Sequence, residues 1–394
     1  MTFSEQLEAA TTPGPDQKIP GAVVIAANAE GKLLHLEAKG YTSMVPETAR
    51  PITPDTTFYI ASCTKLLTTI AVLQNVERGQ LDLDDNVSAI LPEWKSPTIL
   101  TGFDDSTGAP QFSDAKRNIT LRQLLTHTSG MGYDFISPEL KRWREWREQQ
   151  KTPADGDVTT LQPTPLLFEP GEGWEYSCSI DWAGKIVERV NGGIRLGEYM
   201  KKHIWSPLGM SSTGFRLAED EGIRSRLCAT SARSPTGTLV SAEPFPQQNP
   251  KEDRGGGGLY SSPNDYIKVL LSLLKNDGTL LKPETVKTMF TPQLSDDQQL
   301  LAKVTPLEGA MYRGGVDSKA WNFGLGGILN MEDVDGVCKK GSMSWSGLPN
   351  LFWWIDPAAG NCGMYASQLL PPGDPDSMAL AVEFRKDLYA NTGV

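Results

Sequence analysis

Histidine is scarce in this sequence, and the motifs of several common enzyme classes are missing. Only three of the 394 residues are histidines, namely His35, His127 and His203. There is no GxSxG segment, which forms the nucleophile turn of many serine hydrolases, and no HExxH segment of the zinc peptidases. Five cysteines, an odd number without CxxC spacing, argue against a disulfide framework and a cysteine-rich zinc site. The sequence therefore implies neither a metal nor an organic cofactor.

Long hydrophobic runs and an excess of positive charge are also missing. No apolar stretch reaches the roughly 18 residues that a membrane-spanning helix needs. Residues 1–18 lack both the basic and the apolar region of a secretory signal. With 37 basic and 48 acidic residues the formal charge is −11, and the basic patch of a nucleic-acid-binding protein is not visible. These features predict a soluble, cytoplasmic protein that binds neither nucleic acid nor membranes.

The predicted elements divide the chain into three parts. Residues 1–18 are predicted to form a polar N-terminal tail. Residues 19–90 and 255–394 hold most of the β-prone segments and are predicted to form one discontinuous α/β domain. Residues 91–254 favour a mostly helical insert, because helical segments alternate there with proline-rich loops. The predicted strands cover residues 22–27, 32–36, 57–60, 321–330, 336–344, 351–356 and 363–368, and the predicted helices cover residues 62–78, 119–125, 138–151, 180–190, 196–204, 262–275, 283–290 and 376–389.

A serine followed three residues later by a lysine supplies a nucleophile and a base without histidine. On a helix this spacing puts both side chains on one face, and a desolvated lysine amine can accept the serine proton. The pattern occurs at Ser62–Lys65, Ser113–Lys116 and Ser272–Lys275. Only Ser62 directly follows a predicted strand and begins an apolar helix, so its backbone N–H can face an oxyanion. This context selects Ser62 and Lys65, and a capping serine with a nearby lysine is the structural alternative.

A tyrosine can act as a second proton-transfer group. Tyr176 lies between an irregular segment and the predicted helix 180–190, where a phenol can point into a cleft. Tyr260, beside the four glycines 255–258, is the second candidate. Tyr389 matches a Tyr-x-Asn signature most literally but lies close to the end of the sequence. Among the histidines His127 is the best candidate for direct chemistry, although a histidine at a helix end is more often structural.

A third segment of small residues, KGSMSWSGLPN at residues 340–350, can contribute to the same site. Glycine and serine let a strand edge approach a ligand closely, and a backbone N–H from this strand can complete an oxyanion hole. A glycine-containing hairpin turn is the alternative interpretation.

Taken in order, Ser62-x-x-Lys65, Tyr176 and Trp345-Ser346-Gly347 resemble the serine β-lactamase and penicillin-binding-protein superfamily, and within it the class C-like esterases. The segments IPGAV, ASCTKLLTTIAVLQ, ITLRQLLTHTSGM, SIDWAGKIVERVNG, FGLGG and PN-x-x-WxIDP are similar to fungal polyketide acyltransferases of statin pathways and to statin-ester hydrolases. The similarity covers residues 15–390. It implies a β-lactamase-like α/β fold, an antiparallel sheet flanked by helices, with the mostly helical domain 91–254 walling the substrate pocket.

The resemblance also implies roles for particular residues. Ser62 would be the acylated nucleophile, and Lys65 and Tyr176 would share the general-base and general-acid work, in an order left open. The backbone N–H groups of Ser62 and Leu348 would bind the oxyanion.

Substrate-binding residues follow from the resemblance in the same way. Tyr133, Trp345 and Gly347 would lie near the ester. Three aromatic residues in or beside the insert, each individually more typical of a core position, are candidates for the pocket wall: Phe103, Trp143 and Trp174.

Two departures from the family pattern favour neutral esters over β-lactams. The Tyr-x-Asn position contains Tyr176-Ser177-Cys178, and Trp345-Ser346-Gly347 replaces a Lys-Thr-Gly motif whose cation would pair with a carboxylate. The sequence therefore predicts a serine esterase or acyltransferase that passes the acyl group of a hydrophobic, polyketide-type ester to water or an alcohol. A catalytically silent acyl-binding sensor and a β-lactamase or peptidase are the alternatives. The cationic residues 141–147 could dock an acyl carrier protein as donor, although a solvated helix face is the simpler interpretation.

Overall fold

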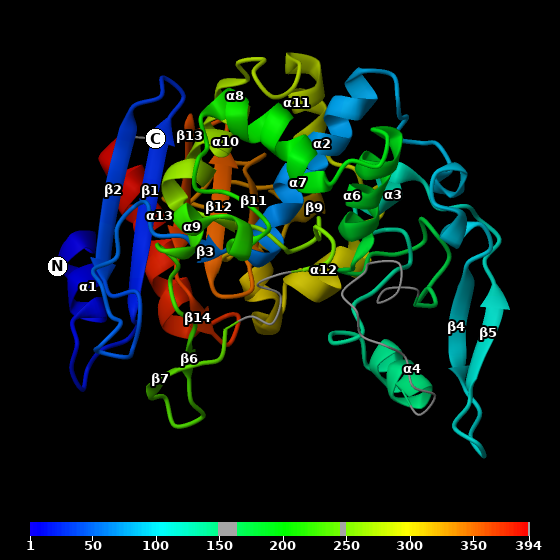
Figure 1. Ribbon diagram of the computed structural model, residues 1–394, viewed down its shortest axis with the longest axis horizontal. Coiled ribbons are helices and arrows are strands. Elements are labelled where there is room, and N and C mark those ends of the chain that lie inside the picture. Colours follow the sequence, from blue (N-terminus) through cyan, green and yellow to red (C-terminus); the bar gives the residue numbers. More distant parts are fainter. Residues whose placement is uncertain (149–163, 245–249, 393–394) are drawn as a thin grey trace.

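The computed structural model describes residues 1–148, 164–244 and 250–392, and a seven-stranded sheet forms its centre (Figure 1). Every strand pair in this sheet is antiparallel. The N-terminal strand β1 pairs with β13 near the end of the chain, with Val24 opposite Tyr365. In spatial order the strands are β2 (Leu33–Gly40), β1 (Gly21–Asn28), β13 (Asn361–Ala366), β12 (Leu351–Asp356), β11 (Met343–Gly347), β10 (Ile328–Asn330) and β9 (Trp321–Phe323).

Helices cover both faces of the sheet, which agrees with the predicted architecture. Alternate residues of β1 point to opposite faces. Val23 and Ile25 join the larger core, which contains α2 (Thr64–Glu77) and α10 (Pro263–Lys275). Val24 joins a second core beneath α1 (Phe3–Thr11) and α13 (Pro375–Thr392). Two buried faces explain why the sequence of β1 is an unbroken apolar run.

The polar tail predicted for residues 1–18 is wrong, because α1 is a capped and packed helix. Thr2 and Glu5 form a capping box at its start. Phe3 and Leu7 are buried, and the ring centroids of Phe3 and Phe384 lie 5.3 Å apart. Polar neighbours obscure the apolar spacing in so short a segment, and α13, which is distant in sequence, supplies the packing partner.

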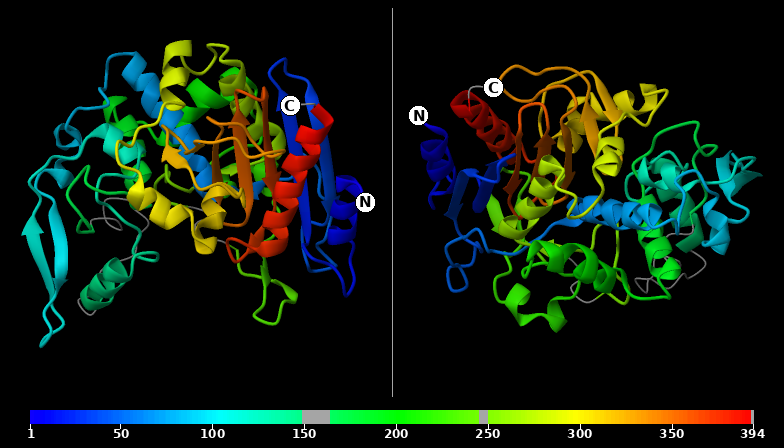
Figure 2. Two further views of the ribbon diagram at one scale, coloured as in Figure 1. Left: turned by 180° about the vertical axis from the view of Figure 1, so that it is seen from behind. Right: turned by 90° about the horizontal axis from the view of Figure 1, so that it is seen from above.

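Residues 91–254, the predicted insert, contain strands that the sequence does not predict. The strands β4 (Thr98–Phe103) and β5 (Pro110–Asp114) form an antiparallel hairpin. The strands β6 (Ser231–Arg233) and β7 (Leu239–Ser241) form another, and β6 also pairs with β14 (Leu369–Leu370). Both hairpins and α4 project from the same side of the molecule (Figures 1 and 2). The helices of this region are α3 (Leu121–Leu125), α4 (Pro138–Glu148), α6 (Ser179–Val190), α7 (Leu196–Met200), α8 (Ser206–Leu208) and α9 (Glu221–Arg224).

Two predicted boundaries change in the other segments. The predicted strand 321–330 is the hairpin β9–β10, and the predicted strand 336–344 is wrong over most of its length. Gly336 and Gly341 have φ angles of 66° and 89°, which belong to turns, so β11 begins only at Met343. The last three residues of the predicted helix 138–151 lie outside the described residues. The remaining elements are β3 (Phe58–Tyr59), β8 (Tyr260–Ser261), α11 (Pro283–Met289) and α12 (Gln298–Val304).

Within the described ranges, every helix is too short or too polar to cross a bilayer. The cytoplasmic location stays a prediction.

Replacing Leu7 with alanine tests the packing of α1. Leu7 is fully buried, so we expect Leu7→Ala to lower the free energy of unfolding by about 2–5 kcal/mol in a urea titration. Leu33→Ala, at a side chain that is 48% exposed, is the matched control and should change it little. Equal effects of the two substitutions would contradict the docking of α1.

Candidate active site

Ser62 is placed by a sharp turn between strand β3 and helix α2. The backbone of Ala61 is left-handed, with a φ angle of 43°, and residues Ala61–Cys63 form a 3₁₀ helix that leads into α2. Left-handed backbone costs a non-glycine residue about 1–3 kcal/mol and is concentrated at functional sites. The turn leaves the side chain of Ser62 half-buried at the start of the helix.

The structure brings four of the predicted site residues together around the hydroxyl of Ser62. The Nζ atom of Lys65 donates to Ser62 Oγ at 3.2 Å, and the phenol of Tyr176 donates to the same Oγ at 2.5 Å. Lys65 also donates to the hydroxyl of Tyr133 at 3.0 Å and to the carbonyl oxygen of Gly256 at 2.6 Å. All three hydrogens of a lysine ammonium group therefore have acceptors.

Burial adjusts the proton affinities of these groups in opposite directions. Desolvation lowers the pKa of Lys65 to about 8, and the carboxylate of Asp181 opposes this shift. Desolvation raises the pKa of Tyr176, and hydrogen bonds with the side chains of Ser62 and Trp345 oppose the rise. Near neutral pH a minor fraction of Lys65 is therefore an uncharged amine, and this fraction grows as the pH rises towards 8, while Tyr176 keeps its proton.

Aromatic rings enclose the phenol of Tyr176 on several sides. Its ring centroid lies 5.2 Å from that of Trp345 and 5.4 Å from that of Tyr312. Trp345 and Tyr312 stack at 5.4 Å with an interplanar angle of 23°. Trp345 therefore lies beside the reactive groups, as the resemblance implies. Tyr312 was not predicted, because no motif surrounds it and only the folded chain brings it to Tyr176.

His127 lies behind Tyr176 and does not contact the serine within the described contacts. Its Nδ1 atom is 3.0 Å from Ser177 Oγ and 3.1 Å from Ser179 Oγ, and its ring centroid is 5.0 Å from that of Tyr176. Burial and the charge of Lys65 hold the pKa of His127 well below its usual value. A neutral imidazole in this position supports the ring of Tyr176. Within the described residues no group of three or more His, Cys, Asp or Glu side chains could hold a metal ion.

Strand β11 approaches the serine turn closely because residue 347 is glycine. A Cβ atom at Gly347 would lie 2.5 Å from the carbonyl oxygen of Ile60 and 3.2 Å from Cys63 Sγ. These two residues flank Ser62, so Leu348, which follows Gly347 directly, lies next to the turn. Gly347 therefore allows close packing here, and the substrate-contact role that the sequence suggested for it stays a prediction.

The segment after Leu348 is held by Asn350, which has a left-handed backbone with a φ angle of 62°. Its side-chain amide donates to the carbonyls of Leu369 and Pro371 and accepts from the N–H groups of Gly373 and Asp374.

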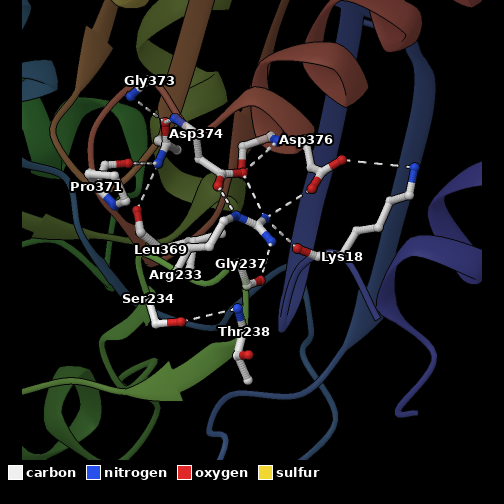
Figure 3. Close-up of polar contacts among 12 residues, drawn as sticks. Lys18, Arg233, Ser234, Gly237, Thr238, Leu369, Pro371, Gly373, Asp374 and Asp376 are labelled. Atoms are coloured by element: carbon white, nitrogen blue, oxygen red, sulfur yellow. Dashed lines mark hydrogen bonds and ion pairs between the residues drawn. The ribbon is translucent and has the colours of Figure 1, made fainter. Parts of the chain in front are cut away.

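Asp374, which donates its N–H to Asn350, also connects this segment to the β6–β7 hairpin. Its carboxylate pairs with Arg233 at 2.5 Å, and Arg233 also contacts Asp376 and the carbonyl of Lys18 (Figure 3). Buried polar contacts thus fix the loop that would present the backbone N–H of Leu348.

The predicted pocket-wall residues are not all brought to this cluster. Trp174 is buried behind His127, with ring centroids 6.0 Å apart. Phe103 lies on β4 and stacks against Arg142 of α4, and Trp143 lies beneath Arg147 of the same helix. None of the described contacts of Phe103 or Trp143 is with the serine cluster, so their part in substrate binding stays a prediction.

Comparisons with known proteins show the family of this chain. The model of the beta-lactamase family matches residues 4–385. This chain belongs to the beta-lactamase family. Its relatives within the beta-lactamase family include a lovastatin esterase from Penicillium rubens, 40% identical over 94% of both chains. A monacolin J acid methylbutanoyltransferase from Aspergillus terreus is 38% identical over 95% of this chain and 92% of the relative.

Solved structures extend the likeness to the whole fold. Unliganded simvastatin synthase from Aspergillus terreus, in its selenomethionyl form, superposes with a TM-score of 0.92 at 36% identity, covering 99% of this chain and 97% of that one. The predicted family and the β-lactamase-like fold are confirmed, and so is the predicted enzyme class of serine esterases and acyltransferases.

Replacing Gly347 with alanine tests the close approach of β11. The added methyl group would collide with the backbone of Ile60 and move the Leu348 N–H away from Ser62. We expect kcat for ester turnover to fall about 100-fold or more, the size of effect seen when one oxyanion-hole donor is lost. Gly222→Ala in α9, where the nearest contact is a side-chain oxygen of Asp220 at 3.2 Å, is the control. Undiminished turnover in Gly347→Ala would rule out this role of β11.

Proposed function

We propose that the protein is a serine esterase or acyltransferase that forms an acyl-Ser62 intermediate from a hydrophobic, polyketide-type ester. One observation carries the proposal. The hydroxyl oxygen of Ser62 lies within hydrogen-bond distance of both Lys65 Nζ and the phenol of Tyr176. A serine with a base and an acid at these distances has the arrangement of an activated nucleophile.

In the proposed acylation step, Lys65 is the base. The hydrogen bonds to Tyr133 and Gly256 occupy two of its hydrogens, so the lone pair of the uncharged amine faces Ser62 Oγ. The serine oxygen attacks the ester carbonyl carbon as its proton moves to Lys65. The N–H groups of Ser62 and Leu348 bind the oxyanion. When the tetrahedral intermediate collapses, the leaving oxygen takes a proton from Tyr176, which is restored from Lys65.

Deacylation repeats these steps with water or an alcohol as the nucleophile. Lys65 accepts the proton of the incoming hydroxyl group, and Ser62 regains its proton as the acyl group departs. The same residues serve hydrolysis and transfer, so the balance between them is set by which acceptor occupies the site.

The walls of the site support an apolar ester as substrate. The rings of Trp345 and Tyr312 pack beside Tyr176, so the surroundings of the serine are largely apolar, and β11 carries no cation that would pair with the carboxylate of a β-lactam. The relatives are named as a lovastatin esterase and a monacolin J acid acyltransferase. We therefore place a statin-like ester among the substrates.

An acyl carrier protein as donor stays a prediction, because the arginines of α4 already have partners in the chain. Arg142 stacks on Phe103, Arg147 lies over Trp143, and Arg144 pairs with Asp134 at 2.6 Å. These contacts favour an ordinary solvated helix face.

Replacing Ser62 with alanine tests the nucleophile. With p-nitrophenyl butyrate and a statin-type ester, we expect steady turnover by the wild type and a loss of at least about a thousandfold in Ser62→Ala, because the covalent step is removed. Mass spectrometry should find the acyl group on the Ser62 peptide. The control is Ser113→Ala, at the exposed second Ser-x-x-Lys sequence. Unchanged ester turnover in Ser62→Ala would refute the assignment, and efficient nitrocefin hydrolysis would favour a β-lactamase.

The pH dependence of turnover tests the assignment of the base. The active form carries an uncharged Lys65, and the pKa of this amine is lowered to about 8. We therefore expect kcat/KM to rise with pH, to reach half its maximum near pH 8, and to show no decline at the ordinary pKa of a tyrosine, since that of Tyr176 is raised. A profile that falls with increasing pH through this range would contradict Lys65 as the base.

A further inference from the structure

Asp181 is a buried carboxylate that has no role in the acylation and deacylation steps proposed above. It lies in the first turn of α6, five residues after Tyr176, and is 6% exposed. Within the described residues it forms no ion pair. Burying a charged group without a cation in contact is costly, whereas asparagine could accept the same hydrogen bond without a charge. The negative charge itself therefore needs an explanation.

The contacts of Asp181 lead to Lys65 through one glycine. The Oδ1 atom of Asp181 accepts the backbone N–H of Gly256 at 3.0 Å, and the carbonyl oxygen of Gly256 accepts from Lys65 Nζ at 2.6 Å. On the preceding residue, Thr68 Oγ1 donates to the carbonyl of Gly255 at 2.7 Å. Hydrogen bonds therefore hold residues 255–256 to α2 on one side and to α6 on the other.

Close packing explains two glycines of this loop, Gly255 and Gly256. A Cβ atom at Gly256 would lie 2.4 Å from a carboxylate oxygen of Asp181. A Cβ atom at Gly255 would lie 2.9 Å from Thr68 and 3.0 Å from the carbonyl oxygen of Ile180. A larger residue at Gly256 would displace the carboxylate of Asp181, and one at Gly255 would press against Thr68 and the backbone of Ile180.

We propose that Asp181 is a positioning residue for Lys65, which holds the Gly256 carbonyl against the amine and supplies the negative charge that faces it across the loop. This inference rests on the proposed function, in which Lys65 is the base. It adds a fourth side chain to the serine, lysine and tyrosine of the site.

The other groups around Lys65 carry no negative charge near neutral pH. Cys63 on its own helix, Cys178 beside α6, and the phenols of Tyr133 and Tyr176 all have raised pKa values because they are buried.

His127 is neutral because its pKa is lowered. Asp181 is thus the carboxylate that stabilises the ammonium form of Lys65 and opposes the effect of burial. Its removal must lower the pKa of Lys65.

The test is the pH profile of the full-length Asp181→Asn variant with p-nitrophenyl butyrate. The amide still accepts the N–H of Gly256 but carries no charge. We expect the midpoint of the rise in kcat/KM to move to lower pH by about one unit, since an opposite charge nearby shifts a pKa by this order. Asp265→Asn is the matched control, because Asp265 is also buried and accepts a backbone N–H, that of Ser212 at 2.6 Å, without entering the site. Its midpoint should stay at the wild-type value.

A purely structural role would lower activity at every pH and leave the midpoint in place. An unchanged or raised midpoint in Asp181→Asn would therefore overturn the proposal. Asp181→Ser also removes the charge and must give the same downward shift if the asparagine variant fails to fold.

A second measurement separates this inference from the proposed function. The rate at which acetic anhydride modifies Lys65, followed by mass spectrometry across pH, reports the amine without any turnover. A downward shift in Asp181→Asn supports the role of Asp181 even if no ester is hydrolysed, in which case only the proposed function fails. An ester-hydrolysing wild type with no shift in either measurement overturns the role of Asp181 alone.

Discussion

The buried amine of Lys65 is the point at which separate parts of the chain meet. Its hydrogen bonds go to Ser62 on its own helix turn, to Tyr133 in the insert and to Gly256 in the loop before β8. A buried ammonium group is tolerated only where its hydrogens find acceptors. The side chain of Lys65 therefore connects α2 both to the segment that contains Tyr133 and to the loop that contains Gly256. A structural requirement and the proposed catalytic role coincide at Lys65.

The elements that could be predicted from the sequence are those whose buried positions are occupied by apolar residues. β1 and most of β12 are apolar on both faces, and α2 has apolar residues on more than one face, because each element is buried along most of its length. α1 was missed because it has few apolar residues, and these are buried only by packing against α13. The hairpin β4–β5 was missed because β5 is mostly exposed and shows no alternation. Short or exposed elements are determined by distant contacts that local patterns do not contain.

The candidate site shows the same division. Ser62, Lys65 and Tyr176 could be selected from the spacing of two residues, a position after a strand and the order of motifs. Tyr312 belongs to no motif, and Asp181 lies in the quoted segment SIDWAGKIVERVNG, for which the resemblance implied no catalytic role. The acceptor at Gly256 is a backbone carbonyl, which no residue type marks. The signal in the sequence was that Asp181 is a carboxylate among apolar residues at the start of the predicted helix 180–190.

The support of the Leu348 loop has a consequence for how the protein is made. Asn350 is anchored by backbone groups between residues 369 and 374, and Asp374 in turn binds Arg233. Ser62, Lys65 and Tyr176 all leave the ribosome long before these anchors do. During translation the segment that contains Leu348 therefore emerges before residues 369–374, which anchor it. The shape of this loop is therefore completed only after residue 374 has been synthesised.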